Sequence, residues 1–301
     1  MNHHELIDTL AVQLSAQVLG RYKFFSASIE SPRVGDHVAA TELHLPRIAG
    51  PGMYEVSAGT LVGRLTPAFW IVQWLGEEYP TILWHHGNAE RPFEHRWFSH
   101  TSLKQIFLRA SEPFPANLVA LAAPFHRRSP IFYAEQLRDL VKFAAMLAVS
   151  TRLVEALIAY LKARTNSRVM VAGISLGGWV TNLHRAFYNT ADLYVPLLAG
   201  AALDEVFTAS LYRNLTGRLA RENPGQLKKV LNFEPEFARI RDDNLFPLLA
   251  RYDQIIHLER HRVCYGNRPI TILEKGHITA SLAHHALRTH LLGQVARCKP
   301  P

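Results

Sequence analysis

Ser175 stands between two glycines in the stretch RVMVAGISLGGW, which gives the pattern G-x-S-x-G. A serine at a sharp strand-to-helix turn needs small neighbours, because its own backbone is strained and the chain passes close to flanking elements. Gly173 and Gly177 are such neighbours, two residues to either side. The pattern favours a nucleophilic serine, and a glycine-rich connection with an incidental serine is the alternative.

The elements around Ser175 support the first interpretation. Residues 169–172 form a short apolar run, typical of a strand buried on both faces of a sheet, and residues 176–188 continue with helical character. A turn between them lifts the serine hydroxyl out of the sheet. It also leaves the backbone amide of Leu176 at a helix N-terminus, where it points to the place at which an oxyanion would develop.

A serine hydroxyl is a poor nucleophile at neutral pH, so catalysis requires a histidine that accepts its proton and usually a carboxylate that orients the histidine. In its strand-to-helix context, G-x-S-x-G resembles the nucleophile motif of the α/β-hydrolase superfamily. The resemblance extends roughly over residues 50–295 and rests on three motifs in the family's order, HGN at 86–88, GISLG at 173–177 and GH at 276–277. It implies an α/β-hydrolase fold, with a mostly parallel central sheet, helices on both faces and a helical cap insertion.

The resemblance also implies that the acid and the histidine follow the serine, on loops after the last strands. His277 follows the strand PITIL and comes directly after a glycine, so it matches the histidine of the family. Asp253 stands just after a strand that ends near Ala250 and matches the acid. Asp204, after the preceding strand, stays an alternative acid, because some hydrolases of this fold place theirs there. A serine–histidine dyad is a further alternative.

The HGN motif implies that the amide of Asn88 is the second oxyanion donor, beside that of Leu176. HGN also occurs in the haloalkane dehalogenases of the superfamily, but their nucleophile is an aspartate, and Ser175 occupies that position here. His85 and His86 could suggest a metal pair. Adjacent residues on a strand point to opposite faces, however, and no carboxylate stands at ligand spacing, so we expect neither a metal nor a cofactor.

Arg127 and Arg128 lie in PFHRRSP, where many relatives have a glycine-containing loop. They could meet an anionic group of the substrate or be solvated loop charges. The net charge of +8 is otherwise spread over short clusters, without a basic stripe interleaved with aromatics or a recognised nucleic-acid module. We therefore expect no nucleic-acid partner.

The elements that must position these residues follow a strand–helix–strand rhythm, which predicts a single domain over residues 1–301. It begins with a helix at 5–20 and has a polar, mostly helical cap insertion at about 204–243. Antiparallel strands are expected from the runs HVAATELHL, MYEVSAGTLVG and FWIVQWL within 22–75. Further strands are expected at 81–84, 117–123, 193–198, 245–250 and 269–273, and further helices at 96–109, 134–164 and 277–292.

The N-terminal helix is expected to be amphipathic, because Leu6, Leu10, Leu14 and Val18 recur every fourth residue, and to dock on its own domain. Contact with a membrane surface is the less favoured interpretation. The longest apolar run elsewhere, residues 143–149, is too short to span a bilayer. The N-terminus lacks the layout of a signal peptide and the two cysteines give no disulfide framework, so a cytoplasmic location is expected.

The resemblance implies a serine hydrolase that acts on a small-molecule acyl substrate and cleaves a carboxylic ester, a thioester or an amide through an acyl-enzyme on Ser175. Two other hypotheses stay open. One is a non-catalytic protein of the same fold that binds a ligand or a partner, and the other is a peripheral membrane protein that hydrolyses acyl lipids. The sequence carries no signal that defines the substrate or the oligomeric state.

Overall fold

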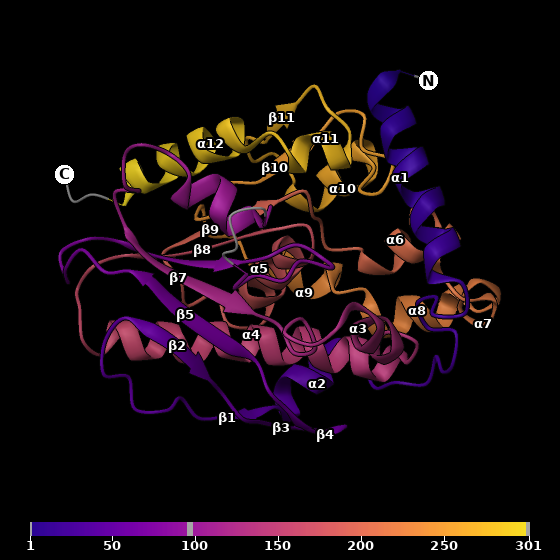
Figure 1. Ribbon diagram of the computed structural model, residues 1–301, viewed down its shortest axis with the longest axis horizontal. Coiled ribbons are helices and arrows are strands. Elements are labelled where there is room, and N and C mark those ends of the chain that lie inside the picture. The colour runs from indigo at the N-terminus through magenta and orange to yellow at the C-terminus, as the bar shows by residue number, and fades with distance from the viewer. Residues whose placement is uncertain (1, 95–98, 299–301) are drawn as a thin grey trace.

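The main sheet of the protein is mostly parallel (Figure 1). A computed structural model describes residues 2–94 and 99–298, and within these ranges eight strands form this sheet. The strands are β2 (Gly52–Glu55), β5 (Ala68–Gln73), β6 (Thr81–His85), β7 (Asn117–Ala122), β8 (Val169–Ile174), β9 (Leu193–Leu197), β10 (Leu248–Ala250) and β11 (Thr271–Leu273). Their order is β11-β10-β9-β8-β6-β7-β5-β2, in which β5 pairs antiparallel with β7 and with β2 and the other pairs are parallel.

The connection direction reverses between β6 and β8. The chain steps from β6 to β7 on one side, then returns across β6 to β8 and continues outward to β11. In open parallel sheets, ligands bind beyond the carboxyl ends of the strands at such a reversal. Ser175 follows β8 and the HGN motif follows β6, so both lie at this position.

Strand β8 is central in the sheet and is buried on both faces. Val169 and Val171 pack into the core on one side of the sheet, whereas Met170 and Ala172 pack into the core on the other side. Successive side chains of a strand alternate between faces, so a strand between two cores must be apolar throughout. This double burial holds the end of β8, and with it Ser175, in a fixed place.

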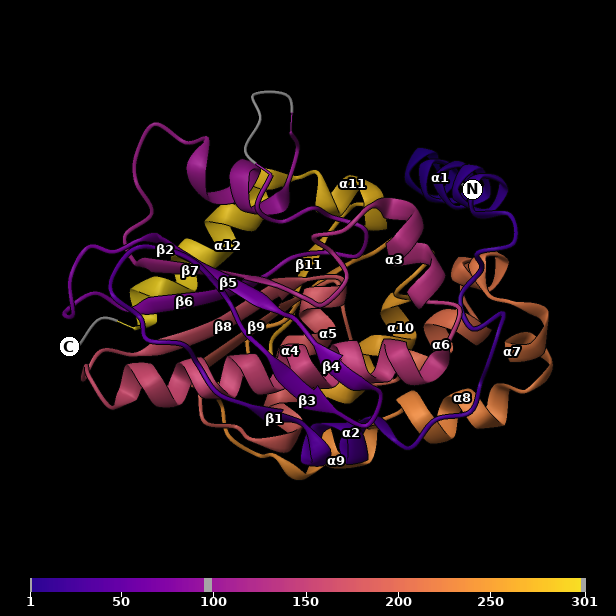
Figure 2. The same cartoon turned by 60° about the horizontal axis from the view of Figure 1, so that its bottom comes forward.

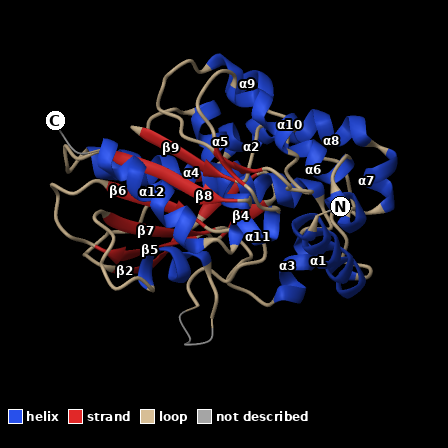
Figure 3. Ribbon diagram, turned by 90° about the horizontal axis from the view of Figure 1, so that it is seen from above, coloured by secondary structure: helices blue, strands red, loops and turns tan. Residues whose placement is uncertain are grey.

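Helices cover both faces of the sheet (Figure 3). Their bounds are α1 (His3–Leu19), α2 (Val34–Ala40), η1 (Lys104–Leu108), α3 (Pro130–Gln136), α4 (Leu140–Lys162), α5 (Leu176–Phe187), α6 (Leu203–Thr208), η2 (Leu211–Leu215), α7 (Arg218–Glu222), α8 (Pro224–Leu231), α9 (Glu234–Arg239), α10 (Leu258–His261), η3 (Arg262–Tyr265), α11 (His277–Ser281) and α12 (His284–Arg297). Helices α4 and α5 pack on one face, and α12 with η1 packs on the other. The expected layering, with a mostly parallel sheet between helices, is confirmed.

Helix α1 docks on the domain, but not through the predicted face. It lies beside α11 (Figure 2) and also contacts η2. The residues that recur every fourth position, Leu6, Leu10, Leu14 and Val18, are between 42% and 86% exposed. The buried residues of this helix are Asp8 and Val12. The expectation that the apolar stripe faces the domain is therefore wrong. The docked face is the one that carries Asp8, whose side chain accepts hydrogen bonds from the domain.

The run HVAATELHL at 37–45 was expected to be a strand, but it contains the end of α2, which begins at Val34, and then the short strand β1 (Glu42–Leu43). The Asp36 side chain accepts a hydrogen bond from the Arg33 amide at 3.0 Å, which satisfies a backbone donor where the helix begins. Strand β1 then pairs with β3 (Ala58–Thr60), which also pairs with β4 (Gly63–Leu65), in a small separate sheet. The hydrogen bond of Asp36 at the start of α2 thus favours a helix where the alternating pattern of the sequence predicted a strand.

Two long helices expected from the sequence are each divided in the structure. The stretch 134–164 contains the end of α3 and then α4, and 277–292 contains α11 and most of α12. Of the helix expected at 96–109, residues 96–98 lie outside the described part of the chain, and η1 covers only Lys104–Leu108.

Helix α4 is long and apolar enough to cross a membrane by length and composition, although its central run at 143–149 is too short by itself. In the fold, 72% of its most apolar 18-residue window is buried. It packs between α2 and the helix that follows Ser175, as a core helix does.

Residues 204–243 are mostly helical, with α6, η2, α7, α8 and α9 in succession. Helices α6, α7 and α8 lie together at the end of the molecule that also carries α1 (Figures 1 and 3). Phe207 of α6 packs against Phe24 and Phe143, with ring centroids 5.1 and 5.5 Å apart. The segment is therefore anchored to the domain by an aromatic cluster.

Candidate active site

Ser175 occupies a strained turn between β8 and α5. Its φ is 52° and its ψ is −111°, a conformation that costs a non-glycine residue about 1–3 kcal/mol. The Ser175 amide donates to the carbonyl oxygen of Leu197 at 2.9 Å, which ties the turn to β9. A Cβ on Gly177 would lie 2.1 Å from the carbonyl oxygen of His85, so only glycine allows α5 to start so close to β6. The sequence-based prediction of a tight turn that requires small neighbours is confirmed.

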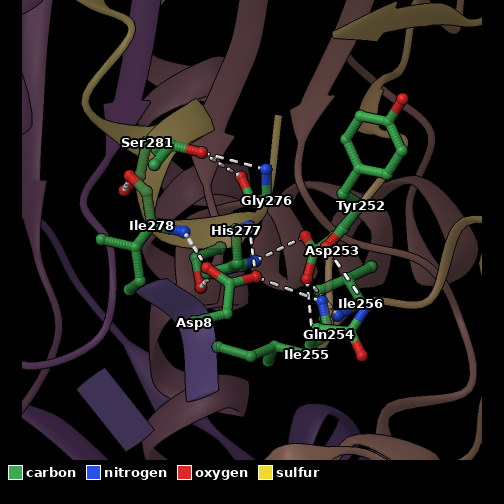
Figure 4. A network of polar contacts seen from close by, with 12 residues as sticks. Asp8, Tyr252, Asp253, Gln254, Ile255, Ile256, Gly276, His277, Ile278 and Ser281 are labelled. Atoms are coloured by element: carbon green, nitrogen blue, oxygen red, sulfur yellow. Dashed lines mark hydrogen bonds and ion pairs between the residues drawn. The ribbon is translucent and has the colours of Figure 1, made fainter. Parts of the chain in front are cut away.

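His277 lies between Ser175 and Asp253. Its Nε2 is 3.1 Å from the Ser175 hydroxyl oxygen. Its Nδ1 is 2.7 Å from Oδ2 of Asp253, and Figure 4 shows this contact. His277 is the first residue of α11, after β11, and Asp253 follows β10. Three loops at the carboxyl ends of the parallel strands β8, β10 and β11 thus bring together a hydroxyl, an imidazole and a carboxylate.

The Asp253 carboxylate is fixed by its own loop. Its Oδ1 accepts hydrogen bonds from the amides of Ile255 at 2.8 Å and Ile256 at 2.7 Å, which leaves Oδ2 for His277. Asp204, the alternative acid, lies on α6, where its Oδ1 accepts from the side chain of Asn232 at 2.8 Å. The structure therefore places Asp253 at His277 and places Asp204 in a different hydrogen-bond network.

The environment of His277 favours its protonated form. Burial by itself lowers the pKa of the imidazole, but the charge of Asp253, its hydrogen bond to Nδ1 and the charge of Asp8 together outweigh burial. The pKa of His277 is therefore raised above its ordinary value of 6.5. A raised pKa makes the imidazole a stronger proton acceptor.

The two residues whose amides are expected to bind an oxyanion, Leu176 and Asn88, both line the cavity at Ser175. Leu176 is the first residue of α5, so its amide belongs to the group of helix-terminal donors that have no partner within the helix. Asn88 lines the same cavity as Ser175 and Leu176. The side-chain oxygen of Asn88 accepts a hydrogen bond from the Tyr133 hydroxyl, which fixes this loop from α3. No sequence motif around Tyr133 predicts this contact with Asn88.

The cavity at Ser175 is small and largely apolar. Its volume is about 30 Å³, and a cavity needs roughly 10–15 Å³ to hold one water molecule, so it has room for a group of two or three heavy atoms. The lining residues come from the segment between α1 and α2, the HGN loop, α4, the turn after β8 with α5, the helical segment after β9 and the Asp253 loop: Phe24, Asn88, Phe143, Ser175, Leu176, Trp179, Leu203, Val206, Phe207, Tyr212, Ile255 and Ile256. Residues of α6 and η2 thus form one wall of the cavity.

His85 and His86 do not point to opposite faces as predicted. Their rings stack, with centroids 4.7 Å apart, because β6 ends at His85 and the chain turns at His86. The His86 Nε2 accepts from the Ala123 amide at 3.1 Å and its Nδ1 donates to the Gly87 carbonyl oxygen at 2.7 Å, while burial lowers its pKa to about 4. A neutral imidazole with both nitrogens engaged braces the HGN loop. Among residues 2–94 and 99–298, no group of three histidine, cysteine, aspartate or glutamate side chains gathers as a metal site requires.

The two arginines of PFHRRSP lie on the surface. Arg127 forms an ion pair with Glu55 of β2, so part of its charge is already balanced, and Arg128 is exposed. Neither lines the cavity at Ser175.

Asp8 is a residue of this region that sequence reasoning missed. It comes from α1, is fully buried, and contacts the backbone of both the His277 loop and the Asp253 loop (Figure 4). The only signal in the sequence is an acidic residue one helical turn before Val12, on the face that docks.

Comparisons with known proteins identify the fold. No family model matches the sequence, and no curated protein matches it. The structure is similar to acetyl xylan esterase 1 from Thermoanaerobacterium sp. JW/SL YS485, with a TM-score of 0.52 and 13% identity over 88% of this chain and 96% of that chain. It is also similar to the acetyl xylan esterase from Paenibacillus sp. R4, with a TM-score of 0.54 and 14% identity over 95% and 93% of the two chains. The structure is similar as well to the acylaminoacyl peptidase of Pyrococcus horikoshii, with a TM-score of 0.53 and 17% identity. This match covers 83% of this chain but only 40% of the peptidase chain.

The protein has the α/β-hydrolase fold. Its strand order, its helices on both faces and its similarity to these three structures agree on this architecture. The prediction of the fold from the three sequence motifs is confirmed.

Proposed function

We propose that this protein is a serine hydrolase that cleaves the carboxylic ester of a small acyl substrate, or a thioester or amide, through an acyl-enzyme on Ser175. The observation that carries the proposal is the continuous contact from the Ser175 hydroxyl through His277 to Asp253, at 3.1 and 2.7 Å. A serine in this position has a base that can take its proton, and the base has a partner that fixes its tautomer. The small apolar cavity beside the hydroxyl supports an acyl group as the bound part of the substrate.

In the acylation half-reaction, the Ser175 oxygen attacks the carbonyl carbon while its proton moves to Nε2 of His277. The carbonyl π electrons move to the carbonyl oxygen, and the amides of Leu176 and Asn88 stabilise the resulting oxyanion. His277 then gives its proton to the leaving alcohol, thiol or amine as the bond to the carbonyl carbon breaks. Asp253 stabilises the transient imidazolium and stays ionised throughout.

In the deacylation half-reaction, a water molecule takes the place of the leaving group. His277 accepts one water proton as the oxygen attacks the acyl carbon, and the same amides bind the second oxyanion. Collapse of this intermediate breaks the bond to Ser175, whose oxygen receives the proton from His277. The products are a carboxylic acid and the free enzyme.

The test compares the unmodified protein with Ser175→Ala, using p-nitrophenyl acetate as substrate and a fluorophosphonate probe as a covalent label. The unmodified protein is expected to hydrolyse the ester and to gain one label, and the variant to lose about 10³- to 10⁶-fold in kcat and take no label. The variant removes one oxygen and should unfold at a similar temperature. Ester hydrolysis at an unchanged rate in Ser175→Ala would reject the proposal, and an unreactive parent protein would favour a non-catalytic binding role.

The exposed apolar stripe of α1 favours a second candidate function, hydrolysis of acyl lipids at a membrane surface. Co-sedimentation with vesicles of phosphatidylcholine and phosphatidylglycerol tests it. The double variant Leu10→Ser with Leu14→Ser should lose vesicle binding, whereas Leu219→Ser, an exposed leucine on α7, should keep it. A parent protein that stays in the supernatant rejects this candidate and leaves the first untouched.

A further inference from the structure

The side chain of Asp8 joins the N-terminal helix to the candidate active site. Its Oδ2 accepts hydrogen bonds from the His277 amide at 2.8 Å and the Gln254 amide at 3.2 Å, and its Oδ1 accepts from the Ile278 amide at 2.9 Å (Figure 4). Asp8 is fully buried. A buried carboxylate is costly unless its oxygens are satisfied, and three backbone donors supply charge-assisted bonds that offset this cost.

The three donors belong to the two loops that carry the acid and the base. Gln254 directly follows Asp253, and His277 itself is one of the donors. One carboxylate therefore sets the position of both loops relative to each other. The contact between Asp253 and His277 needs this relative position, because a shift of about 1 Å is enough to break a hydrogen bond of 2.7 Å.

Asp8 takes the place of the N-cap side chain that α11 lacks. The first two amides of α11 have no partner within the helix, and the residue before it, Gly276, has no side chain to accept from them. A Cβ on Gly276 would lie 2.7 Å from Oδ2 of Asp8 and 2.9 Å from the His4 carbonyl oxygen. Because Gly276 has no Cβ, Asp8 and the His4 carbonyl of α1 can lie close to the His277 loop.

A second contact strengthens the same junction. The Nδ1 of His4 lies 2.9 Å from the Thr279 hydroxyl oxygen, and the Gly276 amide donates to that oxygen, also at 2.9 Å. Helix α1 therefore contacts the His277 loop through two side chains, Asp8 and His4.

We propose that Asp8 is a positioning residue of the active site, which holds the His277 and Asp253 loops together and so links α1 to both loops. The proposal rests on the proposed hydrolase function of Ser175, His277 and Asp253. Asp8 acts through the backbone and does not touch the reacting atoms.

The test compares Asp8→Asn with Val12→Ala. Asparagine has nearly the same shape as aspartate, but it loses the charge and presents an amide group to one backbone donor. Val12 is buried on the same face of α1, so Val12→Ala weakens docking of the helix without changing these polar contacts. Steady-state kinetics with p-nitrophenyl acetate, the pH dependence of kcat/KM and thermal unfolding are measured for both.

Asp8→Asn should lower kcat by about 10- to 100-fold with little change in KM. A misplaced base slows the chemical step but does not weaken substrate binding. It should also move the acid limb of kcat/KM to lower pH, because a negative charge beside His277 is removed. The titratable and charged groups near this junction are Asp253, His3, His4 and Lys275. The substitution leaves these side chains in place, and loss of the Asp8 charge lowers the pKa of His4 as well as that of His277. Val12→Ala should unfold at a lower temperature and keep the acid limb of the parent.

Two results overturn the proposal. One is an Asp8→Asn variant with the kcat and acid limb of the parent, and the other is a Val12→Ala variant that reproduces both changes. If Asp8→Asn does not fold, amide hydrogen exchange of the unmodified protein decides, since His277 and Ile278 amides bonded to a buried carboxylate should exchange slowly. Rapid exchange of the His277 and Ile278 amide hydrogens would show that Asp8 does not hold these amides.

The two proposals fail in different ways. If Ser175→Ala stays active, the hydrolase assignment fails, while amide exchange still tests the Asp8 contact. If Ser175→Ala is inactive and Asp8→Asn is unchanged, only the role of Asp8 fails.

Discussion

The Nδ1 atom of His277 and the Oδ2 atom of Asp253 lie 2.7 Å apart, and the other oxygen of that carboxylate accepts two backbone amides. The carboxylate therefore cannot rotate away without losing three hydrogen bonds. This relationship fixes which nitrogen of His277 carries the hydrogen and leaves Nε2 free to accept a proton from Ser175.

Asp253→Asn should lower kcat by up to about 10⁴-fold, because an amide at this position stabilises the wrong imidazole tautomer while it keeps the shape of the site. Asp204→Asn is the matched control, since it makes the same chemical change in a buried aspartate whose partner is Asn232. Steady-state kinetics of both variants with one ester measure the difference. A larger loss for Asp204→Asn would show that the acid is misassigned.

The rate should decrease on acidification. The base must be neutral to accept the Ser175 proton, and the pKa of His277 is raised above 6.5, so kcat/KM should begin to fall at a pH above this ordinary histidine value. In Asp253→Asn the interaction that raises the pKa is absent, so the remaining activity should titrate at lower pH. A profile of the parent that is flat from pH 5 to about 8 speaks against His277 as the base.

Short acyl groups should be the best substrates. A cavity of about 30 Å³ admits an acetyl group, with its three heavy atoms, but not a longer chain unless the walls move. In a series of p-nitrophenyl esters, kcat/KM should be highest for acetate and should fall for longer chains. Leu203→Ala, which shortens a wall residue from α6, should shift the preference to a longer acyl group. An optimum at eight or more carbons in the parent contradicts this prediction.

Gly177→Ala should destabilise the protein by about 3 kcal/mol, because its Cβ would lie 2.1 Å from the His85 carbonyl oxygen and neither backbone can yield without breaking sheet contacts. Gly293→Ala is the matched control. Gly293 lies in α12 with open space around it, so alanine there should stabilise the helix by roughly 0.5–1 kcal/mol. Thermal unfolding followed by circular dichroism measures both. Equal effects of the two substitutions would contradict the argument.

The sequence predicted the parts of the site that depend on local patterns. The apolar run before Ser175, the glycines around it and the position of His277 after a late strand are all short-range features, and the strands and loops that they predict are present in the structure. The face on which α1 docks was predicted wrongly, because the leucine spacing describes the helix alone. The docked face depends on Asp8 meeting amides of another loop, and this contact between distant residues has no local pattern.

The contact between Asp8 and His277 also has a consequence for the timing of assembly. The two residues are 269 positions apart in the chain, so their contact closes a loop of nearly the whole molecule. A ribosome adds about 5–20 residues per second, so His277 leaves it on the order of tens of seconds after α1. During that interval the Asp8 carboxylate lacks its partners His277 and Ile278, and the site is complete only after both residues have been added.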